Sequence, residues 1–456
     1  MIEMLPEEVL LEIFGFYRLN AIKQSRGRPW KWHRLAQVCR IWRYVLTASS
    51  RRLGLQILCT SRTPIEPILD SWPTLPLVIR YNGPKSKTMP DNIIAALRRR
   101  DRVCEIDLVL PYALMVSIVK LIQEPFQALE CIRLSVKPAS KLPMLIFDEA
   151  LLGGSAPRLK EIRLDGTAFP FPSMQQILSS TTGNLVQLCL SELPDTGYCT
   201  PDALVTSLST LVRLEQLTVD FHSPNYLPQS RECPPHERII LPSLSILFYH
   251  GASEYLDQFA AQVDFPALTY LSIELFHTFN FLIPRFCEFI SRVDALKSPT
   301  EAMLTSSLGF AALSFVQRGE HGRASGEISL GVICERLGWQ LSSMTQILNH
   351  LSPLLSSVDS LTINKPYKTP LGRGVESTRW LGIFRPFTHV RTIHVFDLFV
   401  ADIVDALAKE DMATGVLPEL ARLYLKGYRK SPSVVKAAKQ FVAARRHTGR
   451  TVSLFN

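Results

Sequence analysis

The stretch Leu159-Lys-Glu-Ile162-Arg-Leu164 carries apolar residues at its first, fourth and sixth positions, and this pattern decides the fold. A closely similar stretch, Leu129-Glu-Cys-Ile132-Arg-Leu134, begins 30 residues earlier. Alternation of apolar and polar residues over a few positions predicts a short strand with one buried face. The pattern occurs ten times, starting at Val103, Leu129, Leu159, Leu185, Leu214, Leu244, Leu268, Val358, Val390 and Leu420.

The copies recur every 24 to 32 residues, apart from one gap. A period of this size, with one strand per copy, indicates stacked units that bury their apolar sides against their neighbours. The gap between the central residues Leu271 and Leu361 is 90 residues, or three periods of 30. It holds two apolar runs, 310–315 and 328–332, separated by a Gly-rich segment. We therefore expect a hairpin in place of one repeat there.

The repeat resembles the leucine-rich repeat in a loose form, because the asparagine position of that family is usually absent. The resemblance implies an irregular α/β solenoid whose strands line an open face. Apolar residues make up 46% of the chain and charged residues 20%, which is enough to bury a large core. We expect an α/β fold, with the solenoid over residues 53–431 and a closing helix and strand over residues 432–456.

The first 52 residues lack the repeat and predict a small all-α unit. Leu5-Pro6-Glu7-Glu8 is typical of a helix start, with proline and acidic residues in the first turn. Residues 18–31 are polar and basic, and contain Gly27 and Pro29, so they predict a loop. Apolar residues at helical spacing lie on both sides of this loop. They are Val9, Leu10, Ile13 and Phe14 before it, and Trp32, Leu35, Val38, Cys39, Trp42 and Leu46 after it.

Three stretches in this unit resemble the F-box, namely Leu5-Pro6-Glu7-Glu8-Val9-Leu10, Ile13-Phe14 and Leu35-Ala36-Gln37-Val38-Cys39-Arg40-Ile41-Trp42-Arg43. An F-box ahead of degenerate leucine-rich repeats is similar to the expanded F-box families of mushroom-forming fungi. The resemblance implies docking on a Skp-family adaptor, which joins such proteins to a cullin–RING ubiquitin ligase. It implies adaptor contacts at Leu5, Pro6, Val9, Leu10, Ile13, Phe14, Leu35, Val38 and Cys39.

The same apolar residues could instead form a private core with the repeats, because periodicity alone does not separate the two arrangements. We expect Trp42 to pack inward and to join the helical unit to the first repeat.

Within each repeat, the residues between the buried positions point to the open face. They include both charge signs and several aromatic side chains, which suits protein recognition better than a uniform phosphate-binding track. Phe248 and Tyr270 could also simply pack on each other across neighbouring strands. We expect contacts to a protein target at Arg133, Arg163, Phe248, Tyr270, His394, Arg422 and Tyr424.

The sequence carries no catalytic or phosphate-binding motif that we can identify. His389 and His394 are five residues apart at a strand, so they lie on opposite faces and would not share a metal. The nine cysteines include no C-x-x-C pair, which favours reduced thiols in the cytoplasm or nucleus. We expect no catalytic residue, no cofactor and no metal site.

The net charge of +9 gathers at the two ends of the chain. Residues 1–52 carry +6 and residues 420–456 carry +9, which leaves −6 for the residues between them. A mildly acidic body argues against a nucleic-acid channel. The longest charge-free apolar stretch, residues 302–317, is too short and polar to cross a bilayer, so no membrane contact is expected.

Three functions remain open. The first is a non-catalytic substrate receptor of a Skp–cullin–F-box ubiquitin ligase, with an unidentified protein target. The second is a leucine-rich-repeat scaffold with no link to ubiquitin. The third is a nucleic-acid binder that uses the basic ends.

Overall fold

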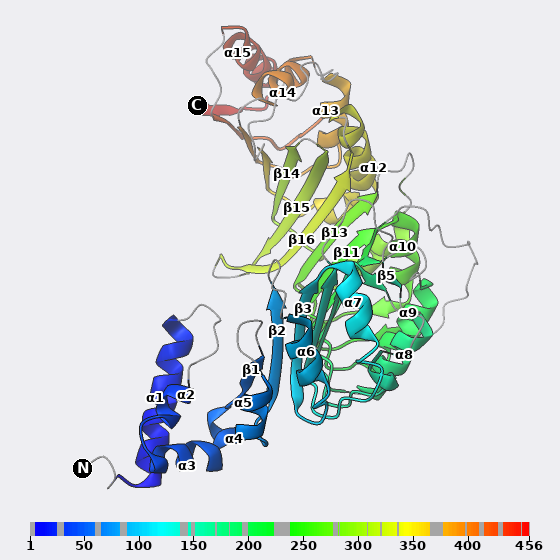
Figure 1. The fold of residues 1–456 in the computed structure, drawn as a ribbon. Coiled ribbons are helices and arrows are strands. Elements are labelled where there is room, and N and C mark those ends of the chain that lie inside the picture. The colour runs from blue at the N-terminus through cyan, green and yellow to red at the C-terminus, as the bar shows by residue number, and fades with distance from the viewer. Residues whose placement is uncertain are drawn as a thin grey trace. The chain divides into compact units, whose positions relative to one another are not determined.

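The structure is a computed structural model. The residues that it describes are 5–24, 32–59, 65–82, 89–136, 145–146, 151–168, 171–181, 183–193, 199–222, 238–276, 281, 283–307, 309–319, 322–334, 337–364, 377–396, 399–409, 415–426, 432–447 and 449–455. The chain forms two compact units, residues 1–181 and residues 182–456. Helices alternate with mostly parallel strands in both units (Figure 1), which confirms the expected α/β class.

The first unit begins with helices alone. α1 (Glu7–Gln24) starts where the proline and the acidic residues predict it. It continues beyond residue 18, so the prediction of a loop over residues 18–31 is wrong for residues 18–24. The reason is that the helix breakers in this stretch, Gly27 and Pro29, come only later. Residues 25–31 lie outside the described residues. Three short helices follow, α2 (His33–Ala36), α3 (Arg40–Ala48) and α4 (Ser50–Leu53).

Five parallel strands complete the first unit, in the spatial order β1, β2, β3, β4, β6. They are β1 (Ile57–Cys59), β2 (Leu77–Asn82), β3 (Val103–Leu110), β4 (Cys131–Val136) and β6 (Glu161–Asp165). The intervening elements are α5 (Glu66–Ser71), α6 (Met89–Leu97), α7 (Tyr112–Val119), the 3₁₀ turn η2 (Leu151–Gly154) and α8 (Phe171–Ser180). A separate pair is formed by β5 (Leu145–Ile146) and β7 (Thr167–Ala168).

The second unit holds the other main strands, in the spatial order β8, β9, β11, β13, β16, β15, β14, β17, β18, β19, β20. They are β8 (Gln187–Leu193), β9 (Gln216–Phe221), β11 (Ile246–Gly251), β13 (Tyr270–Phe276), β14 (Glu301–Ser307), β15 (Phe310–Arg318), β16 (Ala324–Ile333), β17 (Ser360–Asn364), β18 (Thr392–Phe396), β19 (Arg422–Lys426) and β20 (Ser453–Phe455). A short separate pair is β10 (Ile239–Ile240) with β12 (Val263–Asp264).

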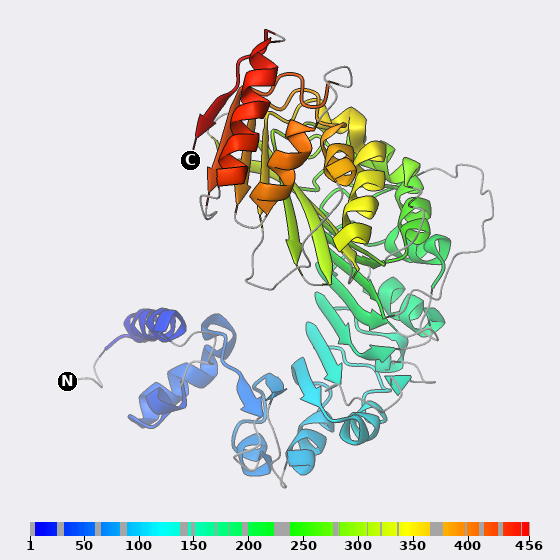
Figure 2. The ribbon, with the colours of Figure 1, turned by 90° about the horizontal axis from the view of Figure 1, so that it is seen from above.

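Helices of the second unit lie side by side along one face of its strands (Figure 2). They are α9 (Pro201–Leu208), α10 (Ser253–Ala261), α11 (Pro284–Arg292), α12 (Leu337–Leu355), α13 (Ser377–Phe384), α14 (Phe399–Ala408) and α15 (Pro432–His447). The other face of the strands carries no helix in the described residues, and we call it the open face of each unit.

The alternation within each strand sorts side chains between the two faces. In β3, Ile106 and Leu108 are fully buried beneath the helices, whereas Glu105 and Asp107 are half-buried on the open face. The register repeats this arrangement, because Ile106 pairs with Ile132 on β4. Each repeat therefore adds its apolar residues to one continuous layer.

A backbone ladder runs beside the first apolar residue of each repeat. The N–H of Leu159 donates to the carbonyl of Ala156, which closes a turn just before β6. The next N–H, that of Lys160, donates to the carbonyl of Glu130 in the preceding repeat at 2.7 Å. Backbone donors thus bind these carbonyls in a chain whose repeats usually lack the asparagine position.

The expected hairpin is confirmed by β15 and β16, which pair antiparallel. The structure adds a third strand, since β14 pairs antiparallel with β15 and parallel with β17. β16 in turn pairs parallel with β13. The chain therefore inserts three strands without reversing the direction of the repeats on either side.

Gln340 joins this insertion to α12, and its side chain is fully buried. Its Oε1 accepts a hydrogen bond from the Ser306 hydroxyl at 2.7 Å. Its Nε2 donates to the carbonyls of Cys334 at 2.6 Å and of Ser307 at 3.1 Å. One amide thus meets polar groups from β14 and from the end of β16, which would otherwise be buried without a partner.

Candidate functional site

Exposed apolar side chains are concentrated on the N-terminal helices. Among the described residues, nine of the fifteen large apolar side chains that are exposed lie between residues 5 and 44. We call this set the N-terminal apolar surface. Its members are Leu5, Val9, Ile13, Phe16, Tyr17, Leu19, Val38, Ile41 and Tyr44. So dense a group on so short a segment is typical of a surface that another molecule covers.

α1 is apolar on both of its faces. Leu10 and Phe14 are fully buried within the first unit, whereas Val9 and Ile13, on another side of the helix, are 41% and 40% exposed. A helix with two apolar faces needs a neighbour on each of them. The described residues of the chain supply a neighbour for only one.

The second part of the surface begins with a break in the helix. The predicted helical series from Trp32 to Leu46 is split, because Cys39 is extended and its Sγ accepts a hydrogen bond from the Trp42 N–H at 3.4 Å. α3 therefore starts afresh at Arg40 and turns Tyr44 outward, 68% exposed.

Tryptophans fix these helices in the first unit. The ring of Trp42 packs edge-on against Phe14, with 5.0 Å between ring centroids. It therefore packs inward as expected, but the contact with the first strands is made by Trp32 instead. Trp32 Nε1 donates to the carbonyl of Gln56 at 2.9 Å, and its ring meets Trp72 at 5.0 Å.

The nine residues expected at an adaptor divide into three groups. Leu5, Pro6, Val9, Ile13 and Val38 are exposed. Leu10, Phe14 and Leu35 are buried, with at most 8% of each exposed, so a partner cannot touch them in this conformation. Cys39 is half-buried and caps α3.

Sequence reasoning missed Phe16, Tyr17, Leu19, Ile41 and Tyr44 on this surface. Phe16 and Tyr17 continue the series Val9, Ile13 by one further turn, which was the signal available. Leu19 falls inside the loop predicted over residues 18–31, so its place on the helix was missed.

The open face of the first unit carries a lattice of ion pairs. Arg133 binds both carboxylate oxygens of Glu161 at 2.6 Å and lies 3.4 Å from Glu105. Arg80 binds Glu105 from the other side at 2.7 Å. Although burial alone would raise the pKa of Glu161, the hydrogen bonds and charge of Arg133 lower it below its ordinary value.

This lattice changes the role expected of the two arginines on that face. Arg133 is committed to carboxylates of its own chain, so it is not available as a target contact in this conformation. Arg163 is exposed and makes no ion pair within the described part of the chain. Of the two, Arg163 alone remains suited to an external partner.

On the open face of the second unit, Phe248 and Tyr270 touch each other, with 5.4 Å between ring centroids. Both side chains are half-buried. The alternative considered above, mutual packing across neighbouring strands, therefore accounts for part of their surface. Neither residue is excluded from a partner contact by burial.

His250 and Asp220 form a further polar pair on this face, with 2.7 Å between His250 Nδ1 and the carboxylate. The other carboxylate oxygen accepts a hydrogen bond from the Glu192 N–H at 3.3 Å. Glu192 has a φ of 51°, at an irregularity in the pairing of β8 with β9. The sequence pattern did not single out this pair, because its members come from different repeats.

At the end of the second unit, three aromatic rings stack across β18, β19 and β20. His394 and Tyr424 lie 4.5 Å apart at 14°, and Tyr424 and Phe455 lie 4.6 Å apart at 13°. We call these rings the C-terminal aromatic stack. Two exposed cations flank it, Arg422 and Lys426. Burial and the positive charges of Lys426 and Arg422 lower the pKa of His394.

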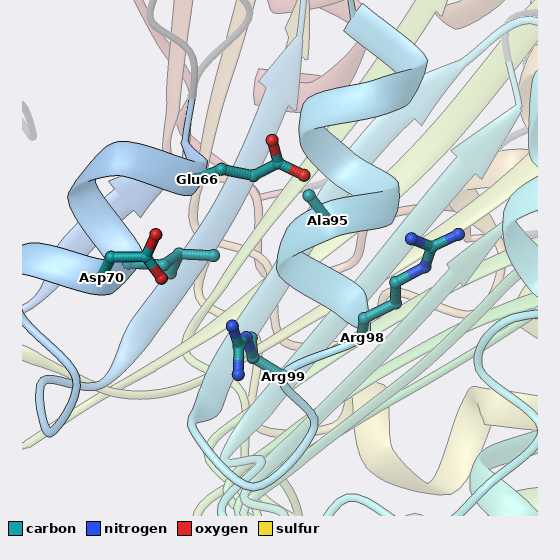
Figure 3. Close-up of a pocket in the computed structure, with 6 residues that line it drawn as sticks. Glu66, Asp70, Ala95, Arg98 and Arg99 are labelled. Atoms are coloured by element: carbon teal, nitrogen blue, oxygen red, sulfur yellow. The ribbon is translucent and has the colours of Figure 1, made fainter.

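A cavity of about 450 Å³ lies between α5 and α6 (Figure 3). Glu66 and Asp70 line it from α5, whereas Arg98 and Arg99 line it from the end of α6. Residues of both charge signs line the cavity, so it favours neither an anion nor a cation. It holds no arrangement of groups that points to a reaction.

The described residues contain no cluster of His, Cys, Asp or Glu suited to a metal, and no helix among them could span a membrane. Eight of the nine cysteines are described, and all eight are free thiols. Burial raises the pKa of Cys59 to about 12 and that of Cys199 to about 11, which keeps both thiols protonated at neutral pH.

The register and the helices define this chain as an α/β repeat protein with an N-terminal helical segment. No protein-family model and no curated protein matches it. Among solved structures it is similar to the leucine-rich repeat-containing protein LegL7 from Legionella pneumophila, at 12% identity and a TM-score of 0.26, covering 71% of this chain and 93% of LegL7. At that TM-score the likeness supports no conclusion, and the repeat class follows from this chain's own strands and helices.

Proposed function

We propose that this protein is a non-catalytic substrate receptor of a Skp–cullin–F-box ubiquitin ligase. The N-terminal apolar surface is the observation that carries this proposal. Five of its nine residues, Leu5, Val9, Ile13, Val38 and Ile41, belong to the stretches that resemble the F-box. Within the described residues, a second apolar face of α1 has no neighbour.

The physical reason for docking is the cost of keeping these side chains in water. Full burial of a side chain such as Val or Ile contributes about 1.5 to 3 kcal/mol. Val9, Ile13 and Tyr44 are each at least 40% exposed, so a groove on an adaptor that covers them would gain a corresponding part of this contribution from each. Part of the gain is offset by the entropy lost on association.

The open faces of the repeats would then select the protein target. They carry both charge signs together with aromatic side chains, which is the composition of protein-binding surfaces. The chain would bring the target to the ligase, and no residue of the chain would take part in the ubiquitin chemistry.

The test is the affinity of the full chain for a purified Skp-family adaptor, measured by calorimetry. The variant is Val9→Asp with Ile13→Asp, which changes exposed residues only. A substitution at Leu10 would be unsuitable, because Leu10 is fully buried and the variant would unfold. We expect micromolar or tighter binding of the wild type and a loss of roughly 100-fold in the variant.

The matched control is Val212→Asp with Ile240→Asp, which places the same charges at residues that are 48% and 60% exposed in the second unit. We expect it to bind the adaptor like the wild type. Equal affinity of the Val9/Ile13 variant and the wild type would contradict the proposal.

A repeat scaffold with no ubiquitin link is the second candidate. The burial of Leu10, Phe14 and Leu35 favours it, because these three residues form a core of the chain's own. The contact of Trp32 with Trp72 fits the same role, in which the helices cap the first strands. Absence of adaptor binding at tens of micromolar would support this candidate.

A further inference from the structure

The C-terminal aromatic stack lies in a row set by the strand register. His394 pairs with Tyr424, and Tyr424 pairs with Phe455, so the three rings follow one another on β18, β19 and β20. Centroid spacings of 4.5 and 4.6 Å match the separation of the strands themselves. The rings therefore stand upright on the open face, one behind the other.

This orientation decides which parts of the rings a ligand can reach. Both faces of the Tyr424 ring are occupied, by His394 on one side and Phe455 on the other. The edge of the Tyr424 ring remains, and the edge of an aromatic ring carries partial positive charge. A base of a nucleic acid needs a free ring face for stacking, and the central ring offers none.

Fixed positive charge borders the rings on both sides. On β19, Arg422 lies two residues before Tyr424 and Lys426 two residues after it, and both are exposed. The guanidinium of Arg422 donates to the Thr392 hydroxyl, and the Lys426 ammonium lies over the Phe396 ring at 5.6 Å. Neither cation has a carboxylate partner among the described residues.

Acidic side chains are absent from the described open-face positions of β17 to β20. Those positions are Ser360, Thr362, Asn364, Thr392, His394, Phe396, Arg422, Tyr424, Lys426, Ser453 and Phe455. The next strand, β14, offers Glu301, but both oxygens of Glu301 are held by Arg318. This part of the face thus differs from the first unit, where Glu161 and Glu105 already neutralise Arg133.

We propose that the open face of β17 to β20 binds an acidic peptide segment. Carboxylates of the peptide would pair with Arg422 and Lys426, and its chain would lie along the edges of the C-terminal aromatic stack. The source of that peptide, a protein brought to the ligase, rests on the proposed function. Binding of the peptide itself does not require the adaptor.

The experiment uses the full chain and fluorescence anisotropy at low and at physiological salt. Three labelled peptides each have a central Tyr flanked by Ala. The remaining positions alternate Ala with one residue type, which is Glu in the first peptide, Gln in the second and Lys in the third. We expect the Glu peptide alone to bind, with an affinity that falls as salt rises. Binding of the Gln peptide as tightly as the Glu peptide would overturn the proposal.

Two variants locate the site. Arg422→Gln with Lys426→Gln is expected to weaken the Glu peptide by roughly tenfold or more, and Tyr424→Leu is expected to weaken it as well. The matched control is Lys436→Gln with Lys439→Gln, which removes the same charge from exposed positions on α15. If the control weakened binding as much as the first variant, general charge would explain the result and the proposal would fail.

A labelled oligouridine tests the other class of ligand. Tighter binding of oligouridine than of the Glu peptide, lost in the Arg422/Lys426 variant, would overturn the proposal in favour of a nucleic-acid site. The Val9/Ile13 variant separates this inference from the proposed function. We expect it to bind the Glu peptide like the wild type, even though its adaptor binding is lost.

Discussion

Arg133 is the residue that holds the open face of the first unit together. It meets Glu161, Glu105 and Asp107, so its removal would leave three carboxylates close together. We expect Arg133→Met to lower the free energy of unfolding by about 1 to 2 kcal/mol at neutral pH, a value reduced by the partial exposure of the pair. Urea unfolding measures this difference.

The pH dependence of that loss has a definite sign. The folded-state pKa of Glu161 is lowered, so the stabilisation is complete above the ordinary Glu value of about 4.3 and is lost as the pH falls through the lowered pKa. The difference in the free energy of unfolding between the wild type and Arg133→Met should therefore become smaller in acid. Arg163→Met, an exposed arginine on the same face, serves as the control. The expectation is wrong if both variants are equally stable at neutral pH.

At the scale of elements, one amide ties the inserted strands to α12. Gln340 is fully buried and meets Ser306, Ser307 and Cys334. We expect Gln340→Ala to lower the free energy of unfolding by about 3 kcal/mol, because buried polar groups lose their partner and a cavity remains. Thermal or urea unfolding measures it.

Asn349→Ala is the matched control, since Asn349 lies on the same helix and is exposed. Its effect should stay within about 0.5 kcal/mol. A Gln340 variant as stable as this control would show that the hydrogen bonds of Gln340 contribute little to the docking of α12.

The sequence predicted elements well where one period dominates. Strands such as β4 and β6 coincide with the repeated pattern, since a half-buried strand must alternate. The hairpin of β15 and β16 was also predictable, from its two apolar runs and the glycines between them. β14 was missed, because Glu301–Ser307 mixes polar and apolar residues and its partners lie far along the chain.

Helix boundaries were less accessible. Cys39 ends the helical series by a backbone turn and a sulfur cap, and neither leaves a periodic signal. α1 continues past its expected end because basic residues are good helix formers and neither glycine nor proline occurs between residue 18 and Gly27.

At the scale of the whole molecule, the candidate sites could be predicted only in part from the sequence. Periodicity placed Val9, Leu10, Ile13 and Phe14 on a helix, but it could not say which of them other helices would cover. Arg133 and Arg422 likewise differ in their neighbours, because Arg133 binds Glu161 whereas Arg422 donates to the Thr392 hydroxyl. Neighbours come from strands that are distant in sequence, so the register had to be known first.

The uncovered apolar surface predicts a property of the free chain. We expect the dye 1-anilinonaphthalene-8-sulfonate to fluoresce with the native protein, because contiguous exposed apolar groups bind it. Val9→Asp with Ile13→Asp should reduce this fluorescence, and Val212→Asp with Ile240→Asp should leave it unchanged. Equal fluorescence in all three proteins would show that the dye does not detect this surface.

The inserted strands bear on how the chain is made. Most strands here can join a neighbour that has already left the ribosome, so folding can follow synthesis one repeat at a time. β14 breaks that order, because its neighbours β15 and β17 both follow it in the chain. The free edge of β13 also stays unpaired until its partner β16, which begins at Ala324, has been synthesised. During that interval the nascent protein presents an open strand edge, which another chain could pair with.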